Sequence, residues 1–243
     1  MDGSPDPRKG NVGLFPQTSW TLLAAAAGSD DGRAAAREEF FARYYRPVRA
    51  YIGAIVRDPE QTDELTQSFF ERAVLSGRLL NAADRSKGSF RPFLKQALRN
   101  FVKDHFRRER TAGSATVRPD AGTHGWDGLT DGPQAASVET EYDRAWVRNL
   151  LEVALSRVAA ACAAKGQDRH FQMFCGRYLH ESGEQPSWRD LGQPFDLDEK
   201  AARNRTETVA RHFRFVLRQM LAEETGSGAG ADVELAELLG VLS

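Results

Sequence analysis

The chain has 243 residues, 41% hydrophobic and 28% charged, with a formal net charge of −1 at pH 7. This composition is typical of a globular protein with one large or two small domains. It excludes attraction of a polyanion by global charge, so nucleic-acid binding would depend on local patches. No apolar run approaches the roughly twenty residues needed to cross a bilayer. The two cysteines exclude a disulfide framework, and with no secretion signal at residues 1–13 we expect a cytoplasmic protein.

The first part of the chain predicts helices separated by polar segments. Residues 1–36 form an N-terminal extension that we expect to be partly disordered. Apolar residues recur with helical spacing over 40–56, where Pro47 indicates a kink or a boundary between two helices. An Asp-Pro pair predicts the start of the next helix, which runs over 59–77. Residues 81–89 then form a predicted polar loop.

Residues 90–110 place an apolar stripe and a basic ridge on one predicted helix. The apolar residues recur at i, i+3 and i+4, whereas Arg or Lys recurs every four residues on a different face. From Arg91 to Arg110, seven basic residues stand against two acidic ones, a local excess of five positive charges. This concentration is typical of a surface that binds nucleic acid. For an isolated helix, a solvated charged face on an ordinary core helix would be the preferred explanation, and the neighbouring segments change this balance.

The second part of the chain begins after a segment of different composition. Residues 111–137 are rich in Gly, Pro, Ser, Thr and Asp, which predicts a flexible linker between two domains. We expect these domains to span 37–110 and 138–224, followed by a tail, 225–243, with a short amphipathic helix. No segment shows the alternation of a strand over a useful length. The predicted fold class is therefore all-α, with two small helical domains.

Residues 188–198 and the basic helix that follows them have the proportions of a helix-turn-helix. A short helix, a tight turn and a longer helix would let the second helix enter a major groove. Any helical hairpin that ends in an Arg-rich helix imitates this motif, so the motif alone leaves DNA reading open. Its candidate DNA-reading residues are Lys200, Arg203, Asn204, Arg205, Glu207, Thr208 and Arg211.

An acidic face precedes an aromatic pair on the helix predicted over 59–77. Asp63, Glu64 and Gln67 are close in helical projection and suit a basic partner surface. Alternatively, they only solvate the helix and favour its N-terminal end through the helix dipole.

The sequence contains no convincing catalytic or metal site. Cys162, His170, Cys175 and His180 match none of the familiar ligand spacings, so buried thiols and core or capping histidines explain them better. We find no phosphate-binding Gly loop, nucleophile elbow or convincing pair of carboxylates. We therefore expect no enzymatic activity, no metal and no cofactor.

Three stretches, taken in this order, resemble the sigma-70 family of bacterial RNA polymerase sigma factors, in its extracytoplasmic-function (ECF) group. The first is 40–48. The second, 63–70, is similar to the face that binds the clamp helices of the polymerase's largest subunit. The third, 90–108, resembles the helix that engages the promoter −10 element. The resemblance extends over 38–221, and it implies a protein that binds core RNA polymerase and directs promoter recognition and DNA melting.

The resemblance also implies roles for individual residues. Asp63, Glu64 and Gln67 would bind core polymerase. The loop at 81–89 lies where the family captures a flipped base, whose trapping offsets an unstacking cost of about a few kcal/mol. The last helix of the second domain would read the −35 element. The residues implied at the −10 element are Asn81, Arg85, Lys87, Arg91, Lys95, Arg99, Asn100, Lys103, Arg107 and Arg108.

The second domain departs from the family pattern in several places. Asp196 replaces a common Gly in the turn, and Pro194 should shorten the first helix. Glu207 and Thr208 stand where the family often has His and Arg, which lowers phosphate affinity, although Glu can accept from cytosine N4. These departures leave open a sigma-like regulator that acts through partner binding without promoter recognition. Many family members are inhibited by an anti-sigma factor, and the sequence does not decide whether such a regulatory partner exists here.

Overall fold

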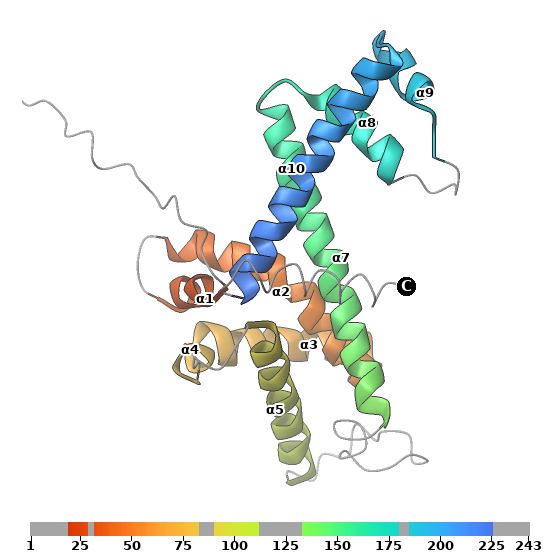
Figure 1. Ribbon diagram of the computed structural model, residues 1–243. Coiled ribbons are helices and arrows are strands. Elements are labelled where there is room, and N and C mark those ends of the chain that lie inside the picture. The colour runs from red at the N-terminus through yellow and green to blue at the C-terminus, as the bar shows by residue number, and fades with distance from the viewer. Residues whose placement is uncertain (1–18, 29–31, 83–89, 112–132, 180–184, 226–243) are drawn as a thin grey trace, which may run out of the picture.

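The computed structural model describes residues 19–28, 32–82, 90–111, 133–179 and 185–225, and every regular element in these ranges is a helix (Figure 1). The predicted all-α class is therefore confirmed. The elements are α1 (Ser19–Ala27), α2 (Arg33–Val56), α3 (Pro59–Phe69), the π-helix η1 (Phe70–Leu75), α4 (Arg78–Ala82), α5 (Phe90–Thr111), α7 (Pro133–Ala163), α8 (Asp168–Tyr178), α9 (Trp188–Gly192), the 3₁₀ helix η3 (Gln193–Phe195) and α10 (Glu199–Thr225).

Helix α2 continues through Pro47, so the sequence position that suggested a boundary lies inside one helix. Proline has no N–H to donate to the carbonyl four residues earlier, which belongs to Arg43. Asn149 of α7 supplies the missing donor: its Nδ2 lies 2.8 Å from the Arg43 carbonyl oxygen and 2.9 Å from that of Ala42. A side chain distant in sequence thus satisfies the backbone group that Pro47 leaves without its helical partner.

The start of α3 follows the prediction, and its continuation adds a feature that the sequence did not reveal. The Asp58 carboxylate accepts a hydrogen bond from the Gln61 backbone N–H at 2.8 Å, and Pro59 occupies the first helical position. The helix then widens into the π-helix η1 before the turn at Gly77, where φ is +75°. Helix α4 includes Asn81, so the first residues of the predicted loop are helical, and 83–89 lie outside the described residues.

A first core lies between α1, α2, α3, η1, α5 and the beginning of α7. Aromatic rings form much of it: the Trp20 and Phe90 centroids are 5.0 Å apart, and those of Phe40 and Phe90 are 6.0 Å apart. Helix α1 lies within the extension expected at 1–36, yet Trp20, Leu22 and Leu23 are buried. Its apolar residues make this helix part of the first core.

A second core forms between the rest of α7, α8 and α10. Helix α7 belongs to both cores, because Val138 and Tyr142 pack in the first and Trp146 begins its contribution to the second. It begins at Pro133, within the segment expected to be linker, and proline suits the first position of a helix. In Figure 1, α7 runs as one long helix from the region of α5 to that of α8. Of the predicted linker and tail, 112–132 and 226–243 lie outside the described residues.

Candidate nucleic-acid and partner interfaces

Helix α5 buries its apolar stripe in the first core, as its spacing predicts. Phe90, Leu94, Leu98 and Val102 are completely buried. Burial of this stripe fixes the rotation of the helix, so the basic ridge lies on a different side.

The basic ridge of α5 divides into a covered half and an exposed half. Arg91, Lys95 and Arg99 have side chains only 14%, 17% and 28% exposed, because they lie against α7. This differs from the open ridge that the sequence suggested. The remaining polar residues of the predicted −10 surface on α5 are exposed, and these are Asn100, Lys103, Arg107 and Arg108.

Acidic and aromatic residues of α7 face the covered half of the ridge. Lys95 Nζ lies 3.0 Å from Asp143 Oδ2 and 3.7 Å from Glu139 Oε2. Burial acts to lower the pKa of Arg99, but its hydrogen bond with Tyr51 and the charge of Glu139 outweigh burial and raise that pKa. The Arg99 guanidinium is therefore held in its charged form beside the Glu139 carboxylate.

The predicted base-capture residues are only partly described. Asn81 is exposed on α4, while Arg85 and Lys87 lie outside the described residues. A pocket for a flipped base at 81–89 stays a prediction.

The acidic face of α3 lies beside a group of aromatic rings. Asp63, Glu64 and Gln67 are all exposed, as the helical spacing predicts. Asp63 accepts a hydrogen bond from Arg49 Nε at 2.6 Å, and Gln67 Nε2 donates to Glu71 Oε1 at 2.8 Å. The acidic face is therefore exposed, with the charge of Asp63 offset by Arg49.

An apolar floor extends this acidic surface into a groove. Phe41 and Tyr45 of α2 and Phe70 of η1 line it together with the acidic face. The Phe41 and Phe70 ring centroids are 4.4 Å apart, and Tyr45 stacks on Phe70 at 5.9 Å. An acidic rim over an apolar floor suits an amphipathic basic helix. The sequence pointed to the carboxylates and to the aromatic pair that contains Phe70, but not to Phe41 and Tyr45, because these two rings come from α2.

The segment predicted to be a helix-turn-helix consists of the short helix α9, the 3₁₀ helix η3 and the long helix α10. The turn between η3 and α10 places Asp196 at φ +56° and ψ +46°, the left-handed conformation that glycine adopts most readily. A Cβ on Gly192 would lie 2.5 Å from the Leu197 carbonyl oxygen, so the turn also needs a glycine there. Asp198 then caps α10 by accepting a hydrogen bond from the Ala201 backbone N–H at 2.6 Å.

The outward face of α10 carries the predicted reading residues. Lys200, Arg203, Asn204, Arg205, Thr208 and Arg211 are exposed, and Glu207 is half-buried. Arg203 Nε donates to Glu207 Oε1 at 2.8 Å, and this hydrogen bond lowers the pKa of Glu207. Tyr178 of α8 and Arg214 line the same groove. Tyr178 was absent from the sequence-based set because only the packing of α8 on α10 brings it there.

Neither cysteine forms a disulfide or belongs to a metal cluster within the described part of the chain. Cys162 is buried, Cys175 is half-buried, and both are free thiols. Burial raises the pKa of both thiols. The described residues contain no group of three or more side chains suited to hold a metal ion, and none of their helices is long and apolar enough to span a bilayer.

One family model matches the part of the chain that contains α3, η1 and α5. Residues 40–112, from within α2 to just past α5, match the family model described as Sigma-70 region 2. No curated protein and no solved structure matches the chain. The matched segment contains the acidic face of α3, its aromatic groove and the basic ridge of α5. Over this segment the chain is therefore similar to region 2 of sigma-70 family proteins.

Proposed function

We propose that this chain is an ECF sigma factor that binds core RNA polymerase and directs promoter recognition and DNA melting. The observation that carries the proposal is the region 2 match over 40–112, because it includes both an exposed acidic face and a basic helix. The acidic face of α3 would bind the polymerase. Basic residues of α5 would neutralise phosphates, and α10 would contact the −35 element. The protein would act in the cytoplasm, where its partners are core polymerase and promoter DNA.

Core binding can be tested by reversing one charge on the acidic face. We expect Glu64→Lys to weaken binding to purified core polymerase about tenfold or more, because a like charge opposes the basic partner surface. Glu141→Lys is the matched control: Glu141 is exposed on α7, away from this groove, and forms a surface ion pair with Arg144. Fluorescence anisotropy of the labelled proteins measures how tightly each variant binds core polymerase. If the unmodified chain does not bind core polymerase, the proposal is wrong.

A second candidate is a sigma-like regulator that binds partner proteins without reading promoters. The observation in its favour is the ion pair between Arg203 and Glu207. Both side chains belong to the predicted DNA-reading set, and in this structure they contact each other. Charge reversal at Arg203 and Arg211 separates the candidates. A sigma factor should lose −35-dependent transcription from a library of genomic promoters, whereas a regulator of this kind should show no such dependence. An anti-sigma factor remains a further proposed partner, to be sought by copurification.

A further inference from the structure

Two carboxylates of this chain lie where the proposed function places DNA phosphates. Glu139 and Asp143 are one turn apart on α7, and they pair with a basic ladder on α5 that has the same spacing. Asp143 contacts Lys95 at 3.0 Å and Arg91 at 3.8 Å. Glu139 contacts Lys95 at 3.7 Å and also pairs with Arg99. Three cations of the predicted −10 surface are therefore already paired with two carboxylates within the molecule.

Aromatic rings of α7 complete the cover over these cations. The Arg91 guanidinium carbon lies 5.0 Å from the centre of the Trp146 ring, and Lys95 Nζ lies 5.6 Å from that of Tyr142. Both distances are within the range of cation–π attraction. Rings and carboxylates of α7 contact the same cations of α5. A phosphate backbone can therefore reach the covered half of the ridge only if α7 moves away.

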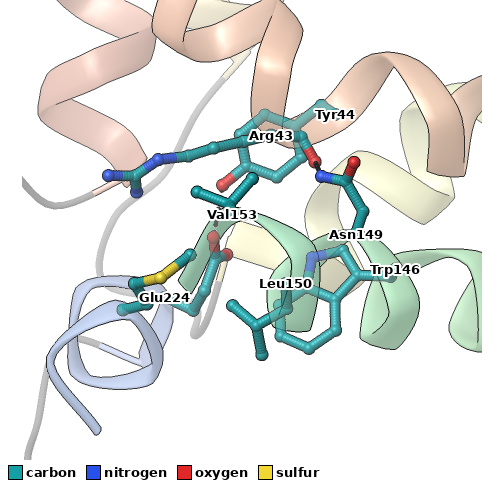
Figure 2. A pocket seen from close by; sticks show the side chains of 8 residues that line it. Arg43, Tyr44, Trp146, Asn149, Leu150, Val153 and Glu224 are labelled. Carbon is teal, nitrogen blue, oxygen red and sulfur yellow. Dashed lines mark hydrogen bonds between the residues drawn. The ribbon is translucent and has the colours of Figure 1, made fainter. Parts of the chain in front are cut away.

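A network of buried polar contacts holds α7 and α10 against α2. Figure 2 shows the centre of this network, where the Asn149 amide points to the backbone of Arg43 and the Glu224 carboxylate meets the Tyr44 hydroxyl. Arg43 also donates to Glu223 Oε2 at 2.7 Å, and Ser19 of α1 donates to Glu224 Oε1 at 2.7 Å. These contacts specify one closed arrangement of the two cores.

The closed arrangement also contains a polar group that opposes it. The Tyr142 hydroxyl is buried and has no hydrogen-bond partner among the described residues, which carries a cost in free energy. Among the residues that the structure describes, Val138 and Tyr142 are the ones that extend the buried first core onto α7. The interface therefore combines ion pairs with apolar contact, since Tyr142 packs edge-on against Tyr51 with ring centroids 6.2 Å apart, and Trp146 and Leu150 of α7 line a pocket with Tyr44.

We propose that α7 is an intramolecular inhibitor of α5. In the closed form, Glu139 and Asp143 occupy the phosphate-binding face of α5 in place of the promoter backbone, so DNA and α7 compete for Arg91, Lys95 and Arg99. Binding of promoter DNA then requires an open form, and its apparent affinity is reduced by the fraction of molecules that are closed. This inference rests on the proposed function of α5 as a DNA-binding helix.

Removing the carboxylates should expose the ridge to DNA without polymerase. We compare the unmodified chain with Asp143→Asn and with Glu139→Gln/Asp143→Asn, using a fluorescein-labelled duplex that contains an unpaired bubble. The double variant should bind this DNA about tenfold more tightly. The slope of log K against log salt concentration should become steeper by about two to three, because three more cations contact phosphates. Glu141→Gln changes charge by the same amount as Asp143→Asn on the same helix and should leave both quantities unchanged.

Two further variants separate competition from a general loosening of the fold. Lys95→Gln/Arg99→Gln, added to the double variant, should abolish the gain in affinity and in salt dependence. Tyr142→Phe removes the unpartnered hydroxyl, favours the closed form and should weaken DNA binding several-fold. A gain in affinity that survives Lys95→Gln/Arg99→Gln would overturn the inference, since it would not involve the ridge.

The inference and the proposed function fail in different ways. If the double variant binds DNA with the affinity and salt dependence of the unmodified chain, while that chain supports transcription with core polymerase, only the inference is wrong. If no variant binds DNA and none supports transcription with core polymerase, the proposed function is wrong as well.

Discussion

Asp196 holds a turn in a backbone conformation that glycine adopts most readily. Its backbone lies in the left-handed region, at φ +56° and ψ +46°. Asp tolerates this region better than most residues because its short side chain can bond locally, whereas Gly avoids the steric cost altogether. The departure noted in the sequence therefore leaves the backbone of the turn intact and affects its stability.

The stability of this turn should follow the tolerance of each residue for the left-handed conformation. We expect the free energy of unfolding to rank Asp196→Gly above the unmodified chain and Asp196→Ala below it, over a span of about 1 kcal/mol. Urea denaturation followed by far-ultraviolet circular dichroism measures all three. An alanine variant as stable as the glycine variant would show that steric cost does not govern the turn.

Other single residues show which predictions a sequence can support. Capping by Asp58 and Asp198 was predictable, because each capping contact spans only three residues. The exposure of Asp63 and Glu64 followed from helical spacing in the same way. The contribution of Tyr178 to the α10 groove, and that of Tyr45 to the acidic groove, depends on how separate helices pack. Local chemistry was therefore predictable, and the neighbours of each side chain were not.

At the scale of elements, α7 compensates for a feature of α2. Pro47 deprives the Arg43 carbonyl of its helical donor, and Asn149 donates to it from α7. The sequence indicated a kink or boundary at Pro47, since nothing local can replace the lost hydrogen bond. The structure keeps one continuous helix because a residue more than a hundred positions away supplies a donor.

The coupling between Pro47 and Asn149 can be measured with a double-mutant cycle. We expect Asn149→Ala to lower the free energy of unfolding by about 1 to 3 kcal/mol, because it leaves a buried carbonyl without a partner. In a Pro47→Ala background, residue 47 regains an N–H, so the same substitution should cost less. Urea denaturation of the four proteins gives the interaction energy. Equal costs in both backgrounds would show that Asn149 acts independently of Pro47.

The same helix pair explains why the predicted division of the chain was incomplete. Composition predicted a linker up to residue 137, but α7 begins at Pro133 and its first turns extend the first core. Glycine-rich composition identifies where regular structure is weak, not which core a following helix will join. The apolar stripe of α5 was correctly predicted, whereas the cover over half of its basic ridge was not, because the carboxylates come from α7.

At the scale of the whole molecule, the contact between α10 and α2 places ionisable groups in the interface between the two cores. Glu223 is 8% exposed and pairs with Arg43, which is equally buried. Burial raises the pKa of Glu223, and the nearby charge of Arg43 only partly counters this effect. Arg157 of α7 also acts to lower that pKa, while Glu39 of α2 acts to raise it. The closed form therefore favours the protonated carboxyl.

This raised pKa predicts how stability depends on pH. A glutamate whose pKa is higher in the folded state contributes stability below its ordinary pKa of 4.5, and this contribution is lost as pH rises through the raised value. Glu223→Gln mimics the neutral carboxyl at every pH. The thermal midpoint of the unmodified chain should therefore fall relative to that of Glu223→Gln as pH rises from about 4.5 towards neutrality.

A second substitution tests whether Arg43 limits this effect. Because the Arg43 charge lowers the pKa of Glu223, Arg43→Met should raise that pKa further and extend the loss of stability to higher pH. Calorimetry across the pH series, with Glu223→Gln added to the Arg43→Met background, isolates the contribution of this one carboxyl. Curves that stay parallel for the unmodified chain and Glu223→Gln would mean that closure takes up no proton at Glu223. A difference that grows as predicted would tie the joining of the two cores to the protonation of one buried side chain.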